Sequence, residues 1–165
     1  MPSPEDLQVV AAQLGREPRG VQAVAHRCPC GSPDVVQTAP RLPDGTPFPT
    51  TFYATCPRLT GAISTLESEG VMKQLEAQLA DDEELQAAYA RAHADYLDRR
   101  AALGMVEEIE GISAGGMPTR VKCLHVLVAH ALAAGPGVNP LGDQALAMLP
   151  HWWASMPCST TLTEG

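Results

Sequence analysis

The segment TFYATCPRLTGAISTLESEG, which spans Thr51–Gly70, decides the fold because it changes from a strand pattern to a helix pattern at one point. Its first six residues are rich in the β-branched and aromatic side chains that strands favour. From Pro57 onward the apolar residues recur at helical spacing. These residues are Leu59, Ile63 and Leu66. The sequence therefore predicts a strand that runs directly into a helix, with Cys56 at the junction.

Two further strands are predicted upstream of this junction. These are VQAVAHRC (Val21–Cys28) and DVVQTA (Asp34–Ala39), which flank the loop Pro29–Pro33. The pattern is typical of a hairpin with a long tip rich in proline and glycine. The Pro43-Asp44-Gly45 sequence then favours a turn that leads to the third strand. The simplest assembly of the three is a small antiparallel sheet.

Helical patterns account for most of the remaining chain. The predicted helices are Pro4–Leu14, a helix from Pro57 that Gly70 terminates, Met72–Leu79, about Glu83–Ala102, Pro118–Ala134 and a short last helix from Asn139 to about Leu149. We therefore expect an α+β fold, in which a three-stranded antiparallel sheet from the N-terminal third packs against four or five helices. Residues 1–150 are predicted to form one domain, and residues 151–165 a tail that docks on it or is partly flexible.

Charge and hydropathy exclude several classes of function. The 165 residues carry 11 basic and 19 acidic side chains, for a net charge of −8, so a general binder of nucleic acid or of anionic membranes is not expected. The longest apolar run, Val121–Gly135, is interrupted by Lys122, His125 and His130, so no transmembrane span is predicted. The N-terminus is acidic where a signal peptide would be basic, and we expect a cytoplasmic protein. The oligomeric state stays open.

The cysteines provide the strongest chemical signal. Five cysteines in a chain without a secretion signal do not indicate a disulfide framework. Cys28 and Cys56 each end a predicted strand, and two such ends can meet at one edge of a sheet. A helix packed on that sheet could bring Cys123 beside them, with His130 seven residues further along on the same helical face.

This convergence predicts a metal site with Cys28, Cys56 and Cys123 as ligands and His130 as the preferred fourth ligand. His93, His125 and Cys30 are substitutes for the fourth position. Zinc is favoured because histidines are abundant near the thiols, and an iron–sulfur cluster is the alternative.

Two other functions stay open at this stage. The first is an enzyme that acts on a small anionic substrate: Arg120 and Lys122, in the first turns of the predicted Pro118–Ala134 helix, would bind the anion, and His125 or His93 would act as general acid or base. The second is a metal-free interaction module that uses the C-terminal tryptophans or the acidic helix as its contact surface.

Several long strings resemble an uncharacterised bacterial family that is catalogued as domain of unknown function 501. They are Cys28–Gly31, Ala39–Pro57, Ala114–His130 and Gly135–Asp143. The resemblance runs from about Leu7 to Leu149 and implies a cytoplasmic, single-domain protein without supplying a reaction. Members that carry histidine in place of Cys56 would favour zinc ligation at that position, with Cys30 an auxiliary thiol and Cys158 outside the ligand set.

Overall fold

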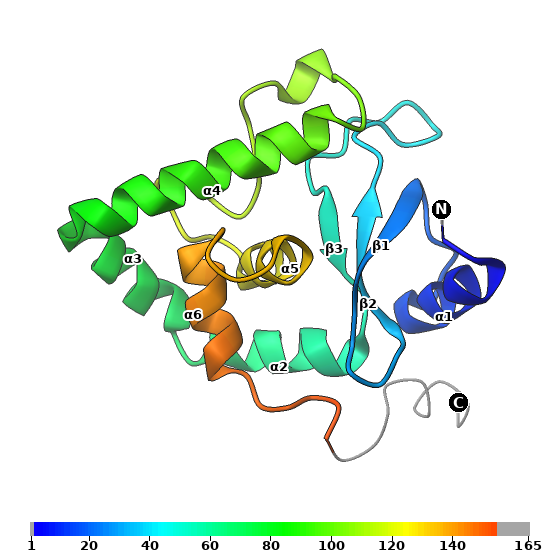
Figure 1. The fold of residues 1–165 in the computed structure, drawn as a ribbon, viewed down its shortest axis with the longest axis horizontal. Coiled ribbons are helices and arrows are strands. Elements are labelled where there is room, and N and C mark those ends of the chain that lie inside the picture. The colour runs from blue at the N-terminus through cyan, green and yellow to red at the C-terminus, as the bar shows by residue number, and fades with distance from the viewer. Residues whose placement is uncertain (1, 155–165) are drawn as a thin grey trace.

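The computed structural model describes residues 2–154, and these residues form three strands, six α-helices and one short 3-10 helix (Figure 1). The strands are β1 (Val21–Arg27), β2 (Pro33–Thr38) and β3 (Phe52–Ala54). The α-helices are α1 (Pro4–Leu14), α2 (Pro57–Ser68), α3 (Val71–Asp81), α4 (Glu83–Ala101), α5 (Leu124–Ala134) and α6 (Pro140–Met148). The 3-10 helix is η1 (Glu107–Ile109). The predicted α+β fold is confirmed. Within the described residues, no helix is both long enough and apolar enough to cross a lipid bilayer.

The sheet has the predicted antiparallel order β1-β2-β3. The central strand β2 is buried along nearly its whole length, because α1 contacts it and α5 also packs on the sheet. In Figure 1, α1 lies on one side of the sheet and all the other helices on the opposite side. Strand β3 forms an edge of the sheet and makes the closest association with α5.

Helix α5 is the centre of the molecule. Helices α2, α3 and α4 surround it on three sides in Figure 1, and the sheet closes the fourth. Seven of its residues, from Leu124 to Ala131, are buried, which explains why its sequence is apolar on every face. The N–H of Leu124 in its first turn bonds to Glu67 of α2, and Leu127 and Ala131 lie against Gly142 of α6.

Helix α5 begins at Leu124, so the prediction of a helix from Pro118 is wrong for its first six residues. Residues 120–123 are not helical, and the partners of their backbone groups come partly from neighbouring helices and partly from the preceding turn. The N–H of Val121 donates to Glu76 Oε1 of α3 at 2.9 Å. Cys123 is therefore the N-cap residue, with extended backbone, and it does not share a helical face with His130.

A tight turn at Gly115-Gly116 leads the chain into this extended segment. The N–H of Arg120 donates to Gly116 O, and the N–H of Lys122 donates to Gly115 O, both at 2.8 Å. A Cβ at Gly116 would lie 2.7 Å from Arg120 O, and its φ of +95° favours glycine, so the turn requires a residue without a side chain. The Tyr89 hydroxyl of α4 donates to Arg120 O at 2.8 Å and fixes the segment from the other side.

The chain after α6 is described as far as residue 154. Trp152 is buried against the core, and Trp153 packs on it with the two rings nearly perpendicular. Cys158 and the rest of the predicted tail lie outside the described residues. The boundary between domain and tail at residue 150 stays a prediction.

Candidate functional site

Three potential metal ligands converge where α5 begins. They are Glu67 from the last turn of α2, Cys123 at the N-cap of α5 and His125 in its first turn. One carboxylate oxygen, the thiol sulfur and one imidazole nitrogen all lie within 4.8 Å of one another. Each side chain is partly exposed, so the group borders solvent.

The His125 ring is held from both of its nitrogens. Its Nδ1 lies 3.3 Å from Glu67 Oε2. Its Nε2 lies 3.3 Å from the Thr60 carbonyl oxygen and 3.3 Å from Ser64 Oγ. Glu67 Oε2 also accepts the N–H of Leu124 at 2.9 Å, so one carboxylate both caps the helix and orients the imidazole.

The thiol and the imidazole stabilise each other's charged forms. Burial raises the pKa of the Cys123 thiol, but the hydrogen bond with His125 and the backbone N–H of Val126 more than offset it, so this pKa lies below its ordinary value. The hydrogen bond with Cys123 raises the pKa of His125 to about 8, against the opposing effect of burial, and the charge of Glu67 adds to the increase. The arrangement favours a thiolate beside an imidazolium.

A cavity of about 520 Å³ adjoins the group. Cys123 and His125 form part of one wall, and β3 with its flanking residues forms another. The C-terminal end of α1 and the start of α2 complete the lining. A molecule in this cavity would therefore lie against Cys123 and His125.

The four predicted metal ligands, Cys28, Cys56, Cys123 and His130, do not form a cluster in which all ligand atoms lie within 4.8 Å of one another. Among residues 2–154, the group of Glu67, Cys123 and His125 is the one found, and it contains neither Cys28 nor Cys56. The reason is the sheet order: Cys28 follows β1 and Cys56 follows β3, so β2 lies between them. Two strand spacings amount to about 10 Å. Both thiols are buried instead in the hydrophobic core.

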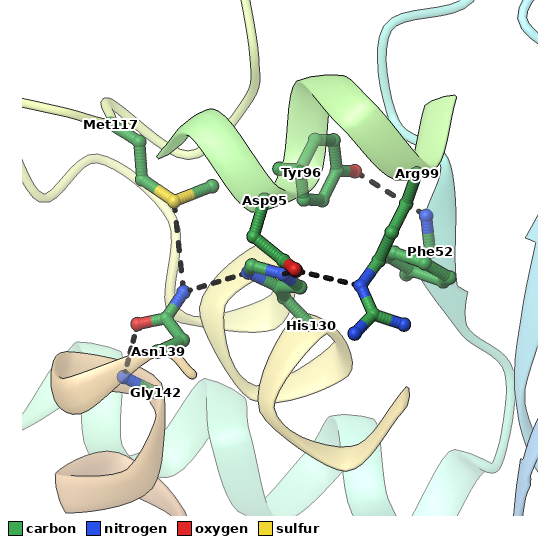
Figure 2. Close-up of polar contacts among 8 residues, drawn as sticks. All are labelled: Phe52, Asp95, Tyr96, Arg99, Met117, His130, Asn139 and Gly142. Atoms are coloured by element: carbon green, nitrogen blue, oxygen red, sulfur yellow. Dashed lines mark hydrogen bonds and ion pairs between the residues drawn. The ribbon is translucent and has the colours of Figure 1, made fainter. Parts of the chain in front are cut away.

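His130 lies too far along α5 to join Cys123, because the seven positions between them correspond to a rise of about 10 Å. Figure 2 shows its surroundings. Nε2 lies 2.8 Å from Asp95 Oδ2, and Nδ1 lies 3.1 Å from Asn139 Nδ2. The ring is fully buried and stacks on Phe52 with the planes 5° apart. Both nitrogens are used, so this histidine connects α4, α5 and α6.

The remaining predicted site residues are dispersed. Arg120 Nε pairs with Glu76 Oε1 at 2.7 Å on the surface and does not precede a helical turn that could hold an anion. Lys122 is exposed and does not line the cavity beside His125. His93 lies on α4, where its Nδ1 is 2.7 Å from Ser113 Oγ. The structure therefore does not bring these two cations and a histidine together.

Comparison with known families agrees with the sequence resemblance. Residues 24–147 match the model of the family described as protein of unknown function (DUF501). The chain belongs to this family. The match includes all three members of the group at α5 and ends before Trp152. Searches of curated proteins and of solved structures found no match.

Sequence reasoning named Cys123 and His125 but missed Glu67. A signal for it exists. Thr60, Ser64 and Glu67 are spaced as one face of a helix, which predicts a polar stripe beside the apolar one. Glu67 is also an acidic residue in the last turn of a helix, where the helix dipole disfavours it, so an external partner is to be expected.

Proposed function

We propose that this chain binds a zinc ion through Glu67, Cys123 and His125. The observation that carries the proposal is the convergence of three ligand atoms within 4.8 Å from two different helices. Carboxylate oxygen, thiolate sulfur and imidazole nitrogen are the donors that zinc takes in proteins. The group holds one thiol, whereas an iron–sulfur cluster needs several, so the donor set favours zinc over the cluster.

The number of ligands favours a reactive site over a purely structural one. Structural zinc sites have four protein ligands, whereas three protein ligands leave one position for water or substrate. That position would adjoin the cavity that Cys123 and His125 line. Zinc bound there would supply a Lewis acid beside the cavity. The proposal places the protein in the cytoplasm, where a reducing environment keeps the thiol available.

Metal content tests the proposal directly. Protein purified without chelator and without an affinity-nickel step should contain about one zinc per chain. Replacing zinc with cobalt should produce the thiolate-to-cobalt charge-transfer absorption, and C123S should lose it. C30S, which removes a thiol outside the group, is the control and should keep both the metal and the absorption. Zinc-free protein that also fails to bind added zinc or cobalt would overturn the proposal.

A second function is favoured by the pairing of the thiol with the imidazole. The Cys123 thiol lies beside the His125 imidazole at a helix N-terminus, and the hydrogen bond between them lowers the pKa of the thiol. The thiolate that this pairing favours is the reactive form of a catalytic cysteine and needs no metal. The cavity would then hold the substrate of a thiolate nucleophile.

Alkylation separates the two functions. If Cys123 works as a nucleophile, metal-free protein should react with iodoacetamide at Cys123 much faster than at Cys30 at pH 7, and added zinc should not change the rate. If Cys123 is a zinc ligand, added zinc should protect Cys123 from alkylation and leave the reaction at Cys30 unchanged. If the chain is a metal-free interaction module, we expect neither zinc binding nor fast alkylation at Cys123.

A further inference from the structure

One wall of the cavity is the edge of the sheet. Strand β3 pairs with β2 on one side, and no other strand of the described residues pairs with its second side. Residues Thr50 and Phe52–Thr55 line the cavity in almost unbroken succession. A wall made of consecutive strand residues presents the main chain as well as side chains.

The strand register shows which backbone groups point away from β2. Thr51 O accepts from Thr38 N–H at 2.7 Å, and Thr55 N–H donates to Asp34 O at 2.9 Å. Tyr53 is paired with Val36 between these two bonds. In an antiparallel ladder the bonded residues alternate, so Thr51, Tyr53 and Thr55 bond to β2. The N–H and C=O groups of the two residues between them therefore point toward the outer edge.

The two residues whose backbone groups face outward, Phe52 and Ala54, differ in whether another helix covers these groups. The N–H of Phe52 is covered by α4, whose Tyr96 hydroxyl oxygen accepts it at 3.3 Å. Ala54 lies at the other end of the strand, where Cys123 and His125 line the same cavity. The part of the edge that Tyr96 does not cover therefore lines the same cavity as Cys123 and His125.

The lining of the cavity indicates the kind of molecule that fits. Among the described residues that line it, none is Asp, Glu, Lys or Arg. A phosphate or carboxylate ligand would find no cation there except the His125 ring. Threonine hydroxyls and a backbone edge suit a neutral ligand rich in amide groups.

We propose that an extended polypeptide segment binds in this cavity as an added strand beside β3, bonding to the N–H and C=O of Ala54. Main-chain hydrogen bonds of this kind hold a peptide with little regard to its side chains. The bound backbone passes Cys123 and His125. The inference deepens the proposed function by naming the substrate class of the same cavity, and it rests on that function for the zinc ion beside the peptide.

Amide hydrogen exchange on the full chain tests this binding mode. The probe is an equimolar pool of pentapeptides, acetylated and amidated at their ends and randomised at the three central positions. At saturation the pool should slow exchange of the Ala54 N–H at least about tenfold, because the amide becomes hydrogen-bonded. The amides of β1, which forms the other edge of the sheet, are the internal control and should not change.

A second pool, N-methylated at two consecutive central residues, blocks both edges of the peptide backbone and should give no protection. Equal protection by both pools, or none by the first, would overturn the inference. Zinc measured in the same samples keeps the two proposals apart. Zinc binding without protection of Ala54 overturns the strand addition alone, whereas protection without zinc binding supports the strand addition and overturns the zinc site.

Discussion

Helix α5 carries two histidines five residues apart, and they lie in opposite environments. His125 is in the first turn, about a third exposed, beside a thiol and a carboxylate. His130 is fully buried, and its nitrogens contact Asp95 and Asn139. Burial lowers the pKa of His130, whereas the hydrogen bond with Cys123 raises that of His125. The same residue type on one apolar helix is therefore a partly exposed member of the candidate site at one end and a buried structural residue at the other.

The largest expected effect comes from removing the buried histidine. H130A should lower the free energy of unfolding by about 3 kcal/mol, because it leaves a cavity between Phe52 and Tyr96 and an unpaired amide at Asn139. Urea denaturation of the metal-free protein measures this loss. Zinc affinity should not change, and a loss of zinc in a folded H130A would show that the two ends of α5 are not independent.

Removing the partly exposed His125 should weaken zinc binding and change stability little, which is the reverse of the effect of H130A. H125A should weaken zinc binding at least about 100-fold, which corresponds to about 2.7 kcal/mol, while the metal-free protein keeps most of its stability. Competition with a chromogenic chelator gives the affinity. H93A is the matched control, because it removes another partly buried histidine outside the group. The distinction between the two histidines fails if H125A unfolds the protein as H130A does.

Substitution of Asn139, which contacts His130, measures how much this contact contributes to stability. Its Oδ1 accepts the N–H of Gly142 at 2.8 Å as the N-cap of α6, and its Nδ2 lies near His130 Nδ1. N139A should cost about 2 kcal/mol, as the sum of a lost cap and an unpaired buried nitrogen. N139D keeps the cap but loses the donor. Its thermal stability should therefore fall between wild type and N139A near pH 6, and equal stability of N139D and wild type would contradict the assigned donor.

The smallest effect is the response to pH, and its sign differs between the two histidines. The folded-state pKa of His130 is lowered, so its contribution is complete above pH 6.5 and is lost as pH falls below that value. The folded-state pKa of His125 is raised, so its contribution is present below pH 6.5 and is lost as pH rises through about 8. One proton changes stability by at most about 1.4 kcal/mol per pH unit.

Unfolding of metal-free protein between pH 5 and 9 measures these slopes. H130Q should flatten the acid limb and leave the alkaline limb unchanged, and H125Q should do the opposite. The pKa of Asp95 is also lowered, because Arg99 and His130 outweigh its burial, but that carboxyl titrates below this range. Identical profiles for the two variants would mean that neither histidine has the environment described.

Most of the fold could be predicted from local patterns. The strand-to-helix change at Cys56-Pro57, the hairpin before it and the glycine that ends α1 are each encoded within a few residues. The start of α5 could not be predicted in this way. Residues 118–123 are not helical: the turn at Gly115-Gly116 bonds to part of this segment, and side chains from α3 and α4, distant in sequence, bond to the backbone of Arg120 and Val121.

Two of the three residues of the candidate site could be predicted from the sequence. Cys123 and His125 stand out because ionisable side chains in an apolar segment need partners. The sequence could not show which partners they have. Cys28 and Cys56 were natural candidates, but they do not belong to the cluster at α5, which contains the carboxylate of Glu67 instead.

By itself, the sequence determined the α+β class, the antiparallel hairpin, most helix boundaries and the membership of one family. These features follow from turn chemistry and from the spacing of apolar residues, which act over a few positions. Only the tertiary structure decided which histidine on α5 is buried, which carboxylate reaches the thiol and which strand edge borders the cavity. Those contacts join residues far apart in the chain, and their geometry depends on how whole helices pack, which no local pattern encodes.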